Sequence, residues 1–100
     1  MQFNLYATFR LLAGVKTVEI ELAEGTTIRQ AVDALVVERP VLRPHWLDAE
    51  GDIHAHVHIF VNGEDARTLA AGFDSPLPRD SVLDFFPPVG GGGCPMKETE

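Results

Sequence analysis

The stretch that decides the fold reads Val57-His58-Ile59-Phe60-Val61-Asn62-Gly63-Glu64-Asp65-Ala66-Arg67. Asn62 and Gly63 both tolerate a positive φ, which a two-residue type I′ turn demands, and they follow a run of alternating apolar and polar residues. We therefore predict a strand over residues 53–61, a tight turn, and a short strand over residues 64–67 that pairs back onto it. This hairpin is the strongest local signal in the chain.

Working outward, the same alternation marks both ends of the chain. We predict a half-buried strand over residues 2–9 and a second over residues 18–22, after a short break at Gly14. So short a connection indicates a hairpin. A last strand is predicted over residues 82–86, because Pro87-Pro88 cannot continue a ladder.

Between these strands the apolar spacing becomes helical. Apolar side chains recur at helical spacing over residues 28–36, and Thr27 with Gln30 forms a capping box, so we predict a helix of about three turns. Pro40 disfavours helix at the residue before it, which ends the helix near residues 37–39.

Residues 40–52 are predicted to form an ordered loop, pinned to the core by Leu42, Trp46 and Leu47. The predicted order is strand, strand, helix, strand, strand, strand. One helix cannot cover both faces of a sheet, so it should pack across one face of a single mixed sheet of four to five strands. The predicted class is α+β, with the domain over residues 1–89.

Composition argues against several classes of function. The formal charge is −7 and the basic residues are scattered, whereas nucleic-acid binding needs clustered Lys and Arg. The acidic balance fits partners with basic surfaces. Cys94 is the single cysteine, which excludes an internal disulfide and a cysteine-based metal site. With neither a signal peptide nor about 18 consecutive apolar residues, we expect a cytoplasmic protein that binds neither nucleic acid nor membrane.

Three histidines alternate along the predicted third strand. His54, His56 and His58 would project from one face, about 7 Å apart in succession, and imidazole suits Zn, Cu or Ni. No carboxylate stands between these histidines in the sequence. A solvated polar face is the preferred interpretation, and we predict no metal site.

The segment after the last predicted strand ends in a glycine run, Gly90, Gly91, Gly92 and Gly93. Glycine loses the most backbone entropy on ordering and has no side chain to bury, so we predict a flexible tail over residues 90–93. Extended, it spans roughly 13 Å at about 3.3 Å per residue, enough to enter a partner's buried active site. A plain flexible linker is the alternative.

The chain resembles the MoaD/ThiS family of ubiquitin-like sulfur carriers over nearly its whole length. The resemblance rests on residues 57–67, on Asp74-Ser75-Pro76-Leu77, and on Phe85-Phe86-Pro87-Pro88-Val89-Gly90-Gly91-Gly92. It implies a β-grasp, ubiquitin-like fold and a carrier protein that is not itself an enzyme and binds no cofactor.

The resemblance also implies the chemistry. An E1-like enzyme of the MoeB/ThiF type uses ATP to adenylate the terminal glycine carboxylate, and a sulfur donor converts the acyl-adenylate to a thiocarboxylate. The carrier then donates sulfur to a biosynthetic enzyme, as in molybdopterin biosynthesis, or in some relatives forms an isopeptide bond to a lysine. The pathway stays open, and so do the alternatives of a ubiquitin-like modifier and of an interaction module with a glycine linker.

The sequence departs from the family pattern after the glycines, where one extra glycine and then Cys94 to Glu100 follow. A glycine inside a peptide bond has no carboxylate to adenylate, so we expect an inactive precursor from which a JAMM-type protease removes residues 94–100. Alignment on Phe-Pro-Pro-Val gives Gly92 as the new terminus, whereas cutting before Cys94 gives Gly93, which we prefer. An N-to-S acyl shift at Cys94 is a weaker alternative, because no assisting His or Asn is evident in the tail.

Four apolar residues are candidates for docking the adenylating and sulfur-accepting enzymes: Phe73, Phe85, Phe86 and Val89. Phe85 and Phe86 point to opposite faces of the last strand, so one of them must belong to the core. The other is the better docking candidate.

Overall fold

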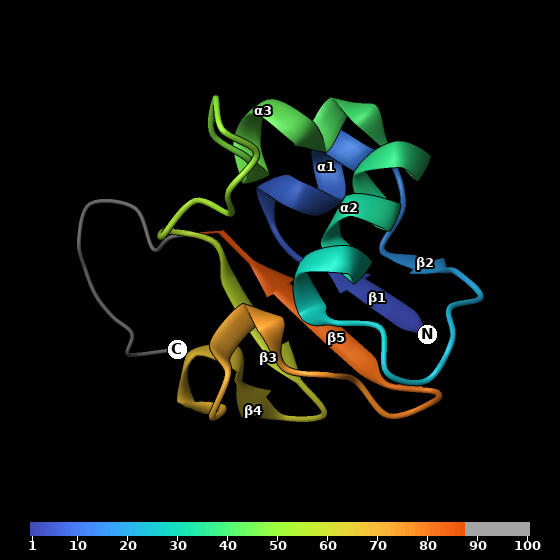
Figure 1. Ribbon diagram of the computed structural model, residues 1–100. Coiled ribbons are helices and arrows are strands. Elements are labelled where there is room, and N and C mark those ends of the chain that lie inside the picture. The colour runs from blue at the N-terminus through green and yellow to red at the C-terminus, as the bar shows by residue number, and fades with distance from the viewer. Residues whose placement is uncertain (88–100) are drawn as a thin grey trace.

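The computed structural model describes residues 1–87, and its centre is one mixed sheet of five strands in the order β2-β1-β5-β3-β4 (Figure 1). The strands are β1 (Gln2–Leu5), β2 (Thr17–Glu19), β3 (His58–Val61), β4 (Glu64–Asp65) and β5 (Val82–Phe86). β5 lies parallel to β1 and antiparallel to β3. The predicted α+β class with one mixed sheet is confirmed, as are the predicted bounds of the last strand.

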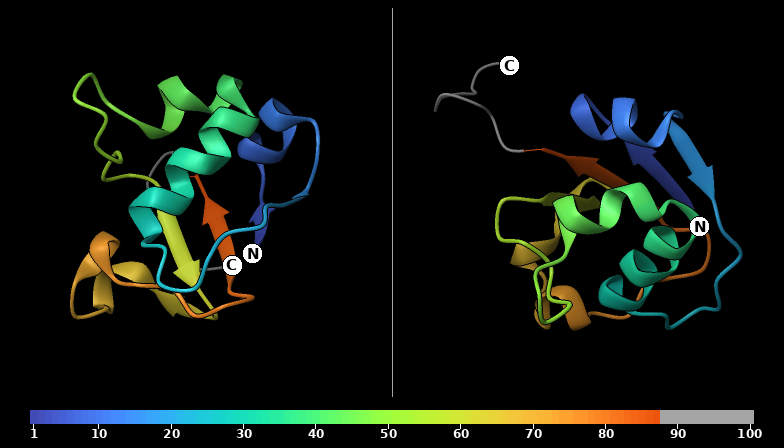
Figure 2. Two further views of the ribbon diagram at one scale, coloured as in Figure 1. Left: turned by 45° about the vertical axis from the view of Figure 1, so that its right-hand side comes forward. Right: turned by 90° about the horizontal axis from the view of Figure 1, so that it is seen from above.

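The main helix, α2 (Ile28–Glu38), crosses one face of the sheet (Figures 1 and 2). Its predicted capping box is formed: the Thr27 hydroxyl accepts from the Gln30 N–H at 3.1 Å, and the Gln30 side chain accepts from the Thr27 N–H at 3.0 Å. The remaining helical elements are short: α1 (Thr8–Ala13), α3 (Arg43–Trp46) and the 3₁₀ helices η1 (Pro40–Leu42), η2 (Ala66–Thr68) and η3 (Gly72–Asp74). No helix within residues 1–87 is long and apolar enough to cross a bilayer.

The core lies between the helices and this face of the sheet, with Trp46 near its centre. The Trp46 ring is fully buried, stacks on Phe85 with the ring centroids 4.5 Å apart, and meets Phe9 edge-on at 5.3 Å. Leu42 and Leu47 are buried beside it, so the predicted pinning of residues 40–52 is confirmed. The segment is not a plain loop, however, because it contains η1 and α3.

The predicted strand over residues 2–9 is wrong beyond Leu5. The chain turns at Ala7, whose φ of 52° is rare for a residue with a side chain, and continues as α1 to the left-handed Gly14 that closes the helix. Phe9 therefore packs into the core from a helix, although its place in the alternating sequence is also that of a core-facing strand residue. The predicted short hairpin connection is replaced by this helix, and β2 ends at Glu19, where its partner β1 begins.

The predicted third strand is wrong before His58. The antiparallel register sets His58 opposite Phe86, so the preceding residues would have to pair with Pro87 and Pro88. Proline has no N–H to donate to a ladder, and pairing stops there. The predicted fourth strand, residues 64–67, is likewise shortened, since η2 begins at Ala66.

Arg67 holds the unpaired segment before β3 in place. Its guanidinium donates to the Ala55 carbonyl and, at 3.2 Å, to the Val57 carbonyl. These bonds satisfy backbone acceptors that the shortened strand leaves without a partner. The ordered path from the long loop into β3 thus depends on a side chain from η2.

The predicted type I′ turn is confirmed, with φ of 50° at Asn62 and 90° at Gly63. A β-carbon at Gly63 would meet open space, so Gly63→Ala is penalised by its backbone conformation alone. We expect a loss of about 1–2 kcal/mol in the free energy of unfolding, measured by urea unfolding with the fluorescence of Trp46, the sole tryptophan. Gly63→Asn should lose less, because asparagine tolerates positive φ. Equal stability of Gly63→Ala and the parent would contradict this reading of the turn.

Candidate functional site

Three aromatic side chains gather on the sheet face opposite the main helix. Tyr6 stacks on Phe86 with the ring centroids 4.4 Å apart, and Phe60 meets Phe86 edge-on at 5.6 Å. All three are partly exposed. We call Tyr6, Phe60 and Phe86 the aromatic cluster; it forms where β1, β5 and β3 run side by side.

Alternation along β5 explains why the cluster faces outward. Leu83 and Phe85 are fully buried under the helices, so Asp84 and Phe86 point to the opposite face. Phe86 is the last residue of β5, and the chain continues through Pro87 towards the glycines. The cluster therefore lies at the end of the sheet from which the glycine tail departs.

The predicted docking residues are separated by the structure. Phe85 is part of the core with no exposed surface, so its assignment as a docking residue is wrong, while Phe86 is the outward-facing member of the pair. Phe73 lies in η3, partly buried against the core beneath the Arg67 guanidinium, 5.9 Å from its ring centroid. Val89 lies outside the described residues.

The predicted reactive and processing residues, Gly90 to Gly93 and Cys94, also lie outside the described residues. Sequence analysis missed Tyr6 and Phe60 as members of the site. Both occupy positions of an alternating run that should face solvent, where an aromatic residue is unusual. An aromatic residue at such a position is the sequence signal that could have identified them.

A polar network borders the aromatic cluster. Asp84 Oδ1 accepts from Asn4 Nδ2 at 2.8 Å and from the Tyr6 hydroxyl at 3.4 Å. Asn4 Oδ1 in turn accepts from Thr17 Oγ1 at 3.1 Å and from Gln2 Nε2 at 3.0 Å. These bonds fix the orientation of the Asp84 carboxylate relative to the rings.

Burial raises the pKa of Tyr6 above its ordinary value of 10.0, and the charge and hydrogen bond of Asp84 raise it further, against a smaller lowering by Arg10. Tyr6 is the only tyrosine, so tyrosinate absorbance reports on it alone. We expect a midpoint above 10.0 in the folded protein and a lower midpoint in Asp84→Asn, whose side chain carries no charge.

The raised pKa has a consequence for stability. The folded protein holds the phenol proton more tightly than the unfolded chain, so this contribution is complete below pH 10.0 and is lost as the pH rises through the folded pKa. A midpoint at or below 10.0, with circular dichroism showing an intact fold, would contradict the described environment of Tyr6.

The predicted row of three histidines is not formed. Only His58 lies in a strand, while His54 and His56 precede it and stack on each other with the ring centroids 4.8 Å apart. Within residues 1–87 no group of three or more His, Cys, Asp or Glu side chains is arranged to hold a metal ion.

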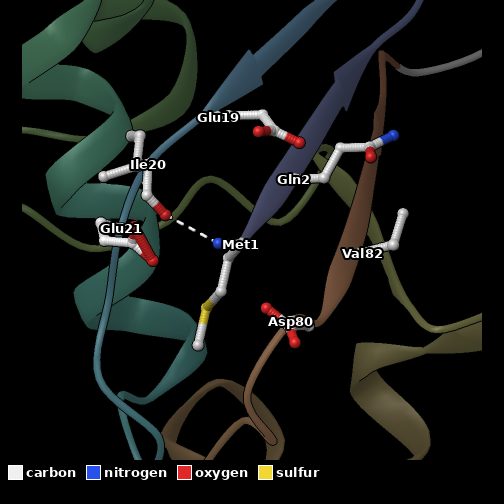
Figure 3. Close-up of a pocket in the computed structure, with 7 residues that line it drawn as sticks. All are labelled: Met1, Gln2, Glu19, Ile20, Glu21, Asp80 and Val82. Atoms are coloured by element: carbon white, nitrogen blue, oxygen red, sulfur yellow. Dashed lines mark hydrogen bonds between the residues drawn. The ribbon is translucent and has the colours of Figure 1, made fainter.

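A cleft of about 450 Å³ lies at the other end of the sheet (Figure 3). Its lining includes Glu19, Glu21 and Asp80, and the Met1 ammonium beside them donates to the Ile20 carbonyl at 2.7 Å. The cleft opens where β1 and β5 begin, whereas the tail continues from the far end of β5. The cleft therefore lies at the opposite end of β5 from Phe86 and the aromatic cluster.

The hairpin, the aromatic cluster and Gly90 to Gly92 all lie within a segment that matches a known family. The model of the ThiS family matches residues 3–92 of this chain. The chain belongs to the ThiS family. This ThiS-family match includes the first three residues of the glycine run and ends at Gly92, before the extension that begins at Cys94.

Relatives of this ThiS-family chain include small archaeal modifier protein 1 of Haloferax volcanii, which is 32% identical over 92 residues covering 92% of this chain and 100% of the relative. A crystal structure of SAMP1 from Haloferax volcanii matches with a TM-score of 0.79 at 31% identity, covering 91% of this chain and 97% of that one. A chain in the BexX/CysO complex of Amycolatopsis orientalis matches with a TM-score of 0.72 at 25% identity, covering 91% and 98%.

These similarities confirm the ubiquitin-like β-grasp fold. They also make this ThiS-family chain a small ubiquitin-like protein of the sulfur-carrier or protein-modifier kind.

Proposed function

We propose that this chain, once trimmed to a terminal glycine, is a sulfur carrier. An E1-like enzyme of the MoeB/ThiF type adenylates its terminal carboxylate with ATP, a sulfur donor converts the acyl-adenylate to a thiocarboxylate, and a biosynthetic enzyme accepts the sulfur. The observation that carries the proposal is that a partly exposed aromatic cluster includes Phe86, which stands four residues before the glycine run of a ThiS-family chain.

The cluster suits a docking role because aromatic rings supply much of the binding energy in protein interfaces. Extended, the arm from Pro87 to Gly92 reaches about 20 Å, at about 3.3 Å per residue. An enzyme that binds the aromatic cluster can therefore receive the chain terminus in an active site up to that distance away. The carrier supplies position, and the partner supplies the catalytic groups and the nucleotide site.

Activation requires a free α-carboxylate, so the proposal includes removal of residues 94–100, which we assign to a JAMM-type protease. Cleavage between Gly93 and Cys94 remains our preferred site, while the family match that ends at Gly92 supports the alternative. We place the reaction in the cytoplasm.

Intact mass spectrometry of the trimmed chain tests the proposal. After incubation with the E1-like enzyme, ATP and a sulfur donor, the terminus should gain the mass difference between sulfur and oxygen. Chains ending at Gly92 and at Gly93 that both stay unmodified, with their fold intact, would overturn it.

The second candidate is a ubiquitin-like modifier, favoured by the name of the Haloferax volcanii relative, small archaeal modifier protein 1. In that role the activated glycine is transferred to lysine side chains of other proteins. Lysine adducts that carry a Gly-Gly remnant, found in the cells that make this protein, would support it.

A further inference from the structure

The Asp84 carboxylate occupies the middle of the exposed sheet face. It lies on the central strand β5, in register with Asn4 of β1 on one side and with Phe60 of β3 on the other. Its side chain is partly buried and touches the aromatic cluster through the Tyr6 hydroxyl. A negative charge is therefore built into the surface that we assign to docking.

One oxygen of this carboxylate is used within the protein and the other is not. Oδ1 receives both hydrogen bonds, from Asn4 and from Tyr6, and Oδ2 receives none from residues 1–87. The ion pairs found within these residues both belong to Arg29, far along the chain in α2. Arg10, the cation over the Tyr6 ring, donates to the Leu5 carbonyl instead.

A partner that covers the aromatic cluster must also cover Asp84. Covering removes water from the carboxylate, which is costly unless the partner supplies a positive group. A guanidinium meets both demands of this surface, because it pairs with a carboxylate and also stacks on aromatic rings, which an ammonium group does less well. The acidic character of the whole chain favours the same kind of partner.

We propose that Asp84 is the charged recognition residue of this face and pairs through Oδ2 with an arginine of the adenylating enzyme. The inference rests on the proposed function and adds the chemistry of the partner surface: an apolar seat for the aromatic cluster beside one guanidinium. Asn4 and Tyr6 act as positioning residues, since they hold Oδ1 and leave Oδ2 for the partner.

The test compares two matched substitutions in the chain trimmed to its glycine. Asp84→Asn keeps the size of the side chain and removes its charge. Asp80→Asn makes the same change at the cleft end of the sheet, where Asp80 is exposed and has a φ of 62° that asparagine tolerates. ATP–pyrophosphate exchange by the E1-like enzyme gives KM and kcat for each carrier, and equilibrium binding without ATP gives the affinity alone.

We expect Asp84→Asn to raise KM and Kd about tenfold or more, with kcat within about twofold of the parent, because a charge pair in the covered interface is lost. Asp80→Asn should change neither value by more than about twofold, since an exposed charge away from the interface contributes little. Asp84→Arg should weaken binding further, and exchanging the facing arginine of the enzyme for glutamate should restore it.

Two failures are distinguishable. If Asp84→Asn supports exchange with the KM of the parent, the role of Asp84 is overturned and the sulfur-carrier proposal stands. A fall in kcat at unchanged KM has the same consequence. If the trimmed parent binds the enzyme in a charge-dependent way but supports no ATP–pyrophosphate exchange, the adenylation proposal is overturned and the role of Asp84 in recognition stands. Absence of binding by the folded parent overturns both.

Discussion

The full-length chain is expected to form no thiocarboxylate, whereas the same chain ending at Gly92 or Gly93 forms one. In adenylation a carboxylate oxygen attacks the α-phosphorus of ATP and expels pyrophosphate, which gives the acyl-adenylate. Sulfur then attacks the acyl carbon, and AMP leaves. In the full-length chain the carbonyl carbon of Gly93 is bonded to the nitrogen of Cys94, so neither glycine carries that oxygen. We therefore expect the thiocarboxylate on the trimmed chain and none on the full-length chain.

Intact mass spectrometry after incubation with the E1-like enzyme, ATP and a sulfur donor measures the result. A trimmed chain whose terminal glycine is amidated is the matched control, because it has the short arm without the carboxylate and should stay unmodified. Thiocarboxylate on a full-length chain that has kept Glu100 would contradict the requirement for trimming, since that product would not contain the glycine terminus.

The two trimmed forms should differ from each other. One residue moves the terminal carbonyl by about 3.3 Å, and displacements of about 1 Å from reactive geometry can lower a rate by about 10²-fold. The form that reacts faster identifies the terminus for which the enzyme is built. Faster reaction of the Gly92 form would overturn our preference for Gly93.

Replacing Trp46 with alanine is expected to lower the free energy of unfolding by about 3–5 kcal/mol. The ring is fully buried between Phe85 and Phe9, and its removal leaves a cavity against the central strand. Small domains have only about 5–15 kcal/mol in total, so this variant should be close to unfolding. Circular dichroism in urea is the appropriate measurement, because the substitution removes the only tryptophan.

Trp46→Phe is the matched control for this substitution. Trp46 Nε1 is buried and has no hydrogen-bond partner among the described residues. Phenylalanine keeps an aromatic ring between Phe85 and Phe9 and removes that unsatisfied donor, which offsets part of the lost packing. We expect a much smaller loss than for alanine. Similar losses for both variants would mean that ring packing is not what stabilises this part of the core.

Features with local causes were predictable from the sequence. The Asn62-Gly63 turn, the Thr27 capping box and the end of β5 before Pro87 each depend on a few neighbouring residues, and all three are present. The predicted strand over residues 2–9 is too long because the alternation continues past the end of β1 into Thr8 and Phe9, the first residues of α1, while the reversal at Ala7 has no sequence signal of its own. β3 was predicted too long because its start depends on pairing with Phe86, which is distant in the chain.

The candidate site was predictable only in part for the same reason. Phe85 and Phe86 belong to a recognisable terminal motif, and alternation requires that one of them is buried. Only the structure identifies Phe85 as the buried residue and Phe86 as the outward-facing one. Tyr6 and Phe60 join it only because β1 and β3 flank β5, an order that no local pattern reveals. The Asp84 network likewise needs the register that brings Asn4 beside it.

The central place of β5 also determines how the molecule responds to force. The strand that continues into the tail is hydrogen-bonded on both edges, to β1 and to β3. A pull on the tail along the strand direction loads both ladders in shear, so their bonds have to yield together and not one after another. A molecular machine that pulls the protein by its C-terminus must therefore break both central ladders of the sheet, so the end that we propose to be activated by partner enzymes is anchored in the middle of the fold.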